Sequence, residues 1–119
     1  MLLMRVNAQE IHAIKGETAY PFLLKDAAPD SLESEKQPVF VFLHGRSLSG
    51  TNLDRVKRYG VLYAINKGQD VPGIIVAPQS RGGWDPDKVI EIVDYVIEHY
   101  NADPDRIYVC GMSMGGYGT

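Results

Sequence analysis

The sequence predicts an α/β protein built on a mainly parallel central sheet with flanking helices. Three apolar runs of strand length, Pro38–Leu43, Gly73–Ala77 and Ile107–Cys110, are separated by segments with helical periodicity. Such continuous apolar runs suit strands that are buried on both faces of a parallel sheet. The order strand, helix, strand, helix, strand implies right-handed crossovers between parallel neighbours. The 119 residues suffice for one small domain, and no run approaches transmembrane length.

The first elements are expected to form a hairpin. Glu10–Ile14 and Thr18–Leu24 are rich in strand formers, and the turn residues Lys15-Gly16-Glu17 separate them. Asp26–Lys36 is charged and contains a proline, so a solvated loop is expected before the strand at Pro38.

Two helices are expected between the later strands. The segment from Leu53 to Ala64 or Ile65 has a moderate one-face apolar pattern, which Gly60 weakens. The second helix starts at Asp85, which can cap it, and Pro86 fits the first turn. Its apolar residues recur at helical spacing: Val89, Ile92, Val93, Val96, Ile97 and Tyr100. Asn101–Asp105 is expected to end this helix before the last strand.

The last strand runs directly into the segment Gly111-Met112-Ser113-Met114-Gly115-Gly116. A Gly-x-Ser-x-Gly pattern after a buried strand is typical of a nucleophile elbow, a strained strand-to-helix turn that exposes the serine hydroxyl. In a chain with 12 glycines the pattern alone is weak, and the alternative is a Gly/Ser loop. The buried strand favours the elbow, with Ser113 as nucleophile and the Met114 N–H as a donor to the developing oxyanion.

A second motif, His44-Gly45-Arg46, follows the strand Pro38–Leu43. The carboxyl ends of parallel strands meet at one edge of the sheet, so this loop is expected near Ser113. Gly45 would let the backbone pass close to a substrate, and the Arg46 N–H is a candidate second oxyanion donor. For His44 a structural role is favoured over general-base catalysis, because the base of such a site follows the serine in chain order.

Together these motifs resemble the α/β-hydrolase superfamily. The residues that carry the resemblance lie between Pro38 and Thr119: His44-Gly45-Arg46, Ala77-Pro78-Gln79, Trp84, Asp103–Val109 and Gly111–Gly118. They look closest to the phospholipase/carboxylesterase and polyhydroxybutyrate-depolymerase-like esterases, a group often labelled predicted peptidases.

The resemblance implies a serine hydrolase that cleaves carboxylic (acyl) esters through an acyl-enzyme. It implies that Ser113 is the nucleophile and that Met114 and Arg46 supply oxyanion N–H groups. It also makes Trp84, Gln79 and His44 candidates for substrate binding. For Trp84 the alternative is a packing role over the sheet edge.

The sequence departs from this family in one respect. The acid and the histidine of the family's triad follow the serine, whereas here the sequence stops at Thr119 and all three histidines precede Ser113. We therefore assign no catalytic His or Asp. The chain is expected to be the N-terminal portion of an α/β-hydrolase domain, truncated after the elbow and almost inactive until the rest of the domain or another chain completes the sheet. Two alternatives stay open: a peptidase or acyltransferase with the same serine, and a non-catalytic binding module.

The composition narrows the possible partners. A net charge of −3 gives no reason to expect nucleic acid, and the expected substrate is a small-molecule or polymer-linked ester. The single cysteine, Cys110, excludes an internal disulfide and argues against a structural zinc site. No motif indicates a metal or any other cofactor.

The predicted domain has three parts. Residues 1–9 are either the remnant of a secretory signal or an ordinary N-terminus, since Met1–Met4 is apolar and Val6–Gln9 has small residues at cleavage-site offsets. The localisation therefore stays open between a secreted or periplasmic protein and a cytoplasmic one. Residues 10–37 form the hairpin and loop, and residues 38–119 form the strand-helix core that ends at the elbow.

Overall fold

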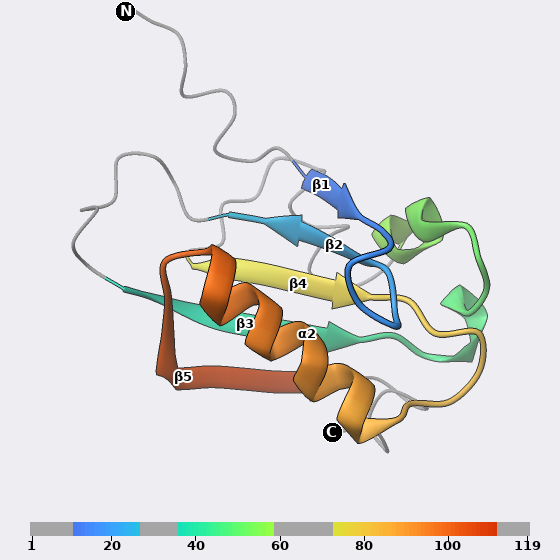
Figure 1. Cartoon of the computed structure of the whole chain (residues 1–119). Coiled ribbons are helices and arrows are strands. Elements are labelled where there is room, and N and C mark those ends of the chain that lie inside the picture. Colours follow the sequence, from blue (N-terminus) through green and yellow to red (C-terminus); the bar gives the residue numbers. More distant parts are fainter. Residues whose placement is uncertain (1–10, 27–35, 59–72, 112–119) are drawn as a thin grey trace, which may run out of the picture.

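The computed structural model describes residues 11–26, 36–58 and 73–111. Within these ranges a five-stranded sheet forms the centre of the fold (Figure 1). Its strands are β1 (Ile11–Ile14), β2 (Phe22–Lys25), β3 (Gln37–Leu43), β4 (Ile74–Pro78) and β5 (Ala102–Gly111). They lie in the order β1-β2-β4-β3-β5. β3 is parallel to β4 and β5, whereas β2 is antiparallel to β1 and β4. The α/β class is confirmed, with a sheet that is antiparallel at its β1 side and parallel beyond.

The strands at the centre of the sheet are strongly buried, and β2 is buried at all four of its residues. All five residues of β4 are buried, and so are the last three of β3. A strand with apolar residues on both faces needs cover on both faces and neighbours on both sides. β4 lies between β2 and β3, which satisfies this requirement.

Helix α2 (Pro86–His99) covers one face of the sheet and is drawn in orange in Figure 1. It begins as the sequence predicts, because the Asp85 side chain accepts a hydrogen bond from the Asp87 N–H at 3.0 Å and Pro86 lies in the first turn. Its buried side chains join the main core, which comprises Phe22, Leu24, Val39, Val41, Leu43, Ile74, Val76, Val89, Ile92, Val96 and Ala102. The predicted amphipathic helix is therefore confirmed.

A smaller core contains Leu23, Leu53, Val56, Ile75 and Ala77. The predicted helix begins at Leu53 as expected, and over Leu53–Arg58 it is a 3-10 helix, η3. Residues three apart share one side of a 3-10 helix, so Leu53 and Val56 are buried together in this geometry too. The rest of the predicted helix lies outside the described residues.

The antiparallel pairing of β1 and β2 confirms the predicted hairpin, with Ile14 opposite Phe22. The second strand begins at Phe22 and not at Thr18 as predicted. The Thr18 hydroxyl donates to the Tyr20 carbonyl at 2.7 Å, a local hydrogen bond that competes with strand pairing. The predicted loop at Asp26–Lys36 and the N-terminal residues 1–9 fall mainly outside the described ranges.

α2 ends at His99, just before the segment that was expected to end it, and β5 begins at Ala102, earlier than the predicted strand start at Ile107. The pairing with β3 is nevertheless irregular there. Gln37 lies opposite Ala102, and Val39 lies opposite Ile107. Between these two pairs β5 has four residues, 103–106, where β3 has only Pro38. Proline has no N–H with which to pair in the sheet. Regular parallel pairing then runs from Ile107 to Gly111, as the apolar sequence predicts.

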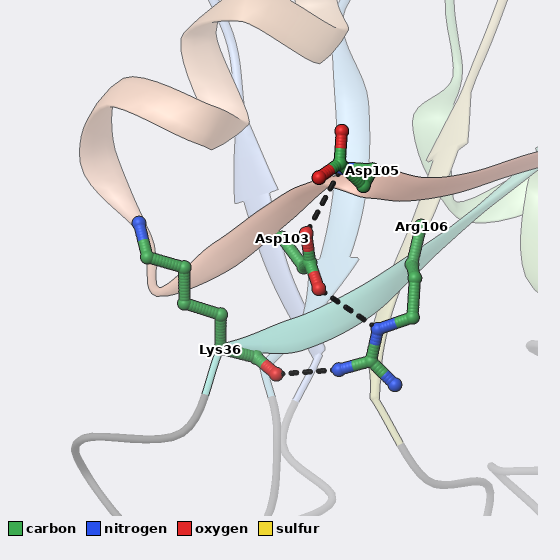
Figure 2. Close-up of polar contacts among 4 residues, drawn as sticks. All are labelled: Lys36, Asp103, Asp105 and Arg106. Atoms are coloured by element: carbon green, nitrogen blue, oxygen red, sulfur yellow. Dashed lines mark hydrogen bonds and ion pairs between the residues drawn. The ribbon is translucent and has the colours of Figure 1, made fainter.

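Hydrogen bonds of Asp103 and Arg106 stabilise this irregular segment (Figure 2). The Asp103 carboxylate accepts the Asp105 N–H and the Arg106 Nε–H, both at 2.9 Å. Arg106 also donates to the Lys36 carbonyl at 2.7 Å and so ties the start of β5 to the residue before β3. The Asp105 N–H and then the Arg106 guanidinium lower the pKa of Asp103. The Asp-Pro-Asp-Arg motif therefore stabilises the pairing of β3 and β5 at the amino end of β5. The candidate site lies at the other end of these strands.

Candidate active site

The candidate site lies at the edge of the sheet where β3 and β5 end side by side. Leu43 pairs with Gly111, so the segment that starts at His44 and the one that follows Gly111 leave neighbouring strands at the same level. Ser113 and Met114, the predicted nucleophile and first oxyanion donor, lie outside the described residues. The described structure therefore covers the strand that precedes the predicted elbow, β5, and the neighbouring loop after β3.

The loop after β3 leads directly into a short 3-10 helix. Gly45 is extended (φ −83°, ψ −179°) and precedes the short 3-10 helix η2 (Arg46–Leu48). The helix is closed by hydrogen bonds from the Leu48 N–H to the Gly45 carbonyl at 3.2 Å and from the Ser49 N–H to the Arg46 carbonyl at 3.0 Å. The Arg46 N–H belongs to the first turn, where a helix offers no acceptor to its own N–H groups. It donates no backbone hydrogen bond within the described part of the chain, and its role as an oxyanion donor stays a prediction.

His44 is fully buried and uses both ring nitrogens within the fold. Nε2 accepts the Ser80 N–H at 3.1 Å, and Nδ1 lies 2.7 Å from the Gly45 carbonyl. Because a backbone N–H can only donate, Nε2 is unprotonated and Nδ1 carries the proton that Gly45 accepts. Burial lowers the pKa of His44 and outweighs the opposing effect of its hydrogen bonds. His44 is thus a neutral ring that holds the loops after β3 and β4 together, with neither nitrogen left for a substrate.

Trp84 covers His44. Its Nε1–H donates to the His44 carbonyl at 3.2 Å, and the two ring centroids are 4.8 Å apart. The Tyr20 ring also packs edge-on against the Trp84 ring, with the two centroids 5.3 Å apart. Tyr20 in turn accepts the Asp85 N–H at 2.8 Å, which links this aromatic group to the start of α2. These contacts give Trp84 the packing role over the sheet edge that the sequence left as an alternative.

Gln79 follows β4 directly and holds the segment between η2 and η3. Its side-chain amide donates to the carbonyls of Leu48 and Asn52, both at 2.8 Å, and the residue is only 1% exposed. In the described structure it positions the segment after η2, and its suggested contact with substrate stays a prediction. Sequence reasoning missed the neighbouring Ser80, whose N–H holds His44 and whose carbonyl accepts the Gly50 N–H at 3.0 Å. The sequence signal that could have indicated the role of Ser80 is the position of Gln79-Ser80, two polar residues directly after a fully buried strand.

Replacing His44 with phenylalanine is expected to lower the free energy of unfolding at pH 7 by about 1–3 kcal/mol, because the buried Ser80 N–H loses its acceptor. The difference from wild type should narrow as the pH falls below 6.5, the ordinary pKa of the histidine. In that range the histidine binds a proton more readily in the unfolded state than in the fold. The free energy of unfolding of the wild type therefore decreases as the pH falls, and the variant lacks this decrease. Urea unfolding between pH 5 and 8 measures both effects.

The matched control for this change is His12→Phe, at an exposed position of β1. It should leave the unfolding free energy close to that of wild type at pH 7. A difference between His44→Phe and wild type that stays constant from pH 8 to pH 5 would contradict a neutral, buried His44.

The strand order, the loop after β3 and the continuation of β5 into Gly-x-Ser-x-Gly define the class of this molecule. The described structure is part of an α/β-hydrolase fold. No helix in the described ranges has the length and apolar character needed to cross a membrane.

Solved structures show the same relationship. A thermostable esterase aligns with a TM-score of 0.72 and 25% identity over 96% of this chain and 37% of its own. The feruloyl esterase module from Clostridium thermocellum aligns with a TM-score of 0.62 and 18% identity over 95% and 48%. A puromycin-hydrolyzing peptidase of Mycobacterium tuberculosis aligns with a TM-score of 0.64 and 18% identity over 100% and 21%. The chain thus spans less than half the length of each. No protein-family model and no curated protein matches it.

Proposed function

We propose that this chain supplies the nucleophile and the oxyanion-binding loop of a serine hydrolase that acts on carboxylic esters. The observation that carries the proposal is the pairing of Leu43 with Gly111, which sets the loop His44–Arg46 beside the strand that leads to Ser113. The similarity to esterases supports the class of reaction.

In the proposed reaction the Ser113 hydroxyl attacks the ester carbonyl, and its proton passes to a base. The N–H groups of Met114 and Arg46 stabilise the negative charge that develops on the carbonyl oxygen. Collapse of the tetrahedral intermediate releases the alcohol and leaves an acyl-enzyme, which water then hydrolyses to the carboxylic acid. The base and its acid partner are proposed to come from residues outside this sequence.

His44, Trp84 and Gln79 support this chemistry indirectly in the proposal. His44 and Gln79 fix the loop that carries the Arg46 N–H, and Trp84 shields the His44 ring. An oxyanion hole depends on donors that are held in place before the charge develops. The buried hydrogen bonds of His44 and Gln79 supply that rigidity.

A fluorophosphonate probe tests the proposal on the longest natural protein that contains this sequence. An activated serine oxygen attacks phosphorus, displaces fluoride and leaves a stable phosphonate ester. Peptide mapping by mass spectrometry should place the label on Ser113. A matched 4-nitrophenyl ester and anilide then separate esterase from peptidase activity. A folded protein that takes up no label would reject the catalytic proposal and favour the non-catalytic binding module.

A further inference from the structure

A cavity of about 640 Å³ lies beside the candidate site. Its walls are the β1–β2 connection, the segment after η2 with the start of η3, the loop after β4 and the first turn of α2. Ile14, Phe22 and Pro78 lie level in the sheet, so these walls stand at the edge from which His44 leaves β3. Ser80 belongs to the cavity wall and also holds His44, so the cavity adjoins the proposed oxyanion loop.

Three cationic side chains line this cavity: Lys15, Arg81 and Lys88. No aspartate or glutamate is among its lining residues in the described part of the chain, and none of the three cations is ion-paired there. The nearby Glu91 carboxylate accepts the Ala19 N–H at 2.9 Å. In a chain of net charge −3, three cations without an ion pair around one concave surface favour the approach of an anion.

The cavity wall is also polar where it meets the candidate site. Gln79 and Ser80 belong to this wall but are each only 1% exposed, so the cationic side chains supply the charge that a ligand can reach. The Lys88 Nζ lies 5.5 Å from the centre of the Tyr20 ring, which also lines the cavity. Cations without an ion pair favour an anionic ligand over an apolar acyl chain.

We propose that this cavity binds an anionic group of the substrate, a carboxylate or a phosphate carried on the ester that Ser113 cleaves. The assignment of this anion to the substrate rests on the proposed ester hydrolysis at Ser113. The three cations attract the anion, and its attachment to the ester brings the carbonyl to the adjoining loop at Arg46. The protein is then a hydrolase that prefers esters with a negative charge remote from the bond cleaved.

Binding tests the anion site without any need for activity. Calorimetry at low ionic strength should show saturable binding of adipate or of inorganic phosphate, and none of the neutral adipamide. The two anions distinguish a carboxylate ligand from a phosphorylated one. The triple variant Lys15→Gln, Arg81→Gln, Lys88→Gln should weaken binding about tenfold or more. All three positions are exposed, so folding should persist, and thermal unfolding checks it. Lys57→Gln is the matched control, an η3 lysine outside the cavity lining.

Hydrolysis tests the link to substrate. The kcat/KM for 4-nitrophenyl hydrogen adipate should exceed that for 4-nitrophenyl hexanoate, and the triple variant should remove the preference. Anion binding with hydrolysis of neither ester would retain the site and reject the hydrolase. Hydrolysis of both esters without preference, together with no binding of either anion, would reject the site and retain the hydrolase. Anion binding equal in wild type and triple variant would overturn the assignment to this cavity.

Discussion

Ser113→Ala is expected to lower the kcat/KM for ester hydrolysis by about 10³-fold or more and to abolish fluorophosphonate labelling. Without the hydroxyl no acyl-enzyme can form, and only oxyanion stabilisation and substrate binding remain to accelerate the reaction. The effect should fall on kcat, because the serine oxygen acts in the chemical step. Stopped-flow or steady-state assays of a 4-nitrophenyl ester measure it, in the longest natural protein that contains this sequence.

Ser49→Ala is the matched control. Ser49 follows η2 in the loop after β3, and its buried hydroxyl has no hydrogen-bond partner in the described structure. Removing an unpaired buried hydroxyl should leave the unfolding free energy unchanged or raise it slightly, with kcat/KM near wild type. If Ser113→Ala retains full activity while it is folded, the hydrolysis belongs to another residue and the elbow assignment is wrong.

The elements that the sequence predicts well are those whose signal is local. β3 and β4 are continuous apolar runs, and α2 carries its own cap at Asp85 and its own buried stripe. The start of β5 is different, because Asp103-Pro104-Asp105 has the composition of a turn. Long-range contacts hold it beside β3: Arg106 donates to the Lys36 carbonyl, 70 residues away in sequence, and the Gln37 N–H donates to the Asn101 carbonyl at 2.9 Å. No local pattern contains that information.

The same distinction applies to the candidate site. The loop His44-Gly45-Arg46 and the serine pattern can be found by motif, because their chemistry demands particular residues at fixed spacing. The roles of Gln79 and Ser80 come from hydrogen bonds that span 31 and 36 residues and depend on how β3 and β4 pair. The cavity is assembled from several separate segments, so its charge is invisible in a sequence whose cations look scattered.

Gly73→Ala is expected to destabilise the fold by about 2–5 kcal/mol, from the left-handed backbone and the overpacking together. Gly73 precedes β4 with φ +91°, and a Cβ there would lie 2.9 Å from the Pro38 carbonyl oxygen and 3.1 Å from Pro38 Cγ. Relief by a backbone shift would also cost stability, because the Gly73 carbonyl accepts a hydrogen bond at 3.2 Å from the buried Lys25 ammonium. Urea unfolding at pH 7 gives the free energy directly.

Gly16→Ala separates the two causes. Gly16 has nearly the same conformation, φ +86°, but a Cβ built there meets no atom within 4 Å. Its substitution should therefore cost only the conformational part, about 1–2 kcal/mol. The excess loss at Gly73 then measures how closely the backbone of β3 approaches the start of β4. Equal decreases in the free energy of unfolding for the two variants would contradict the close contact between Gly73 and Pro38. The positive φ angle alone would then explain glycine at both positions.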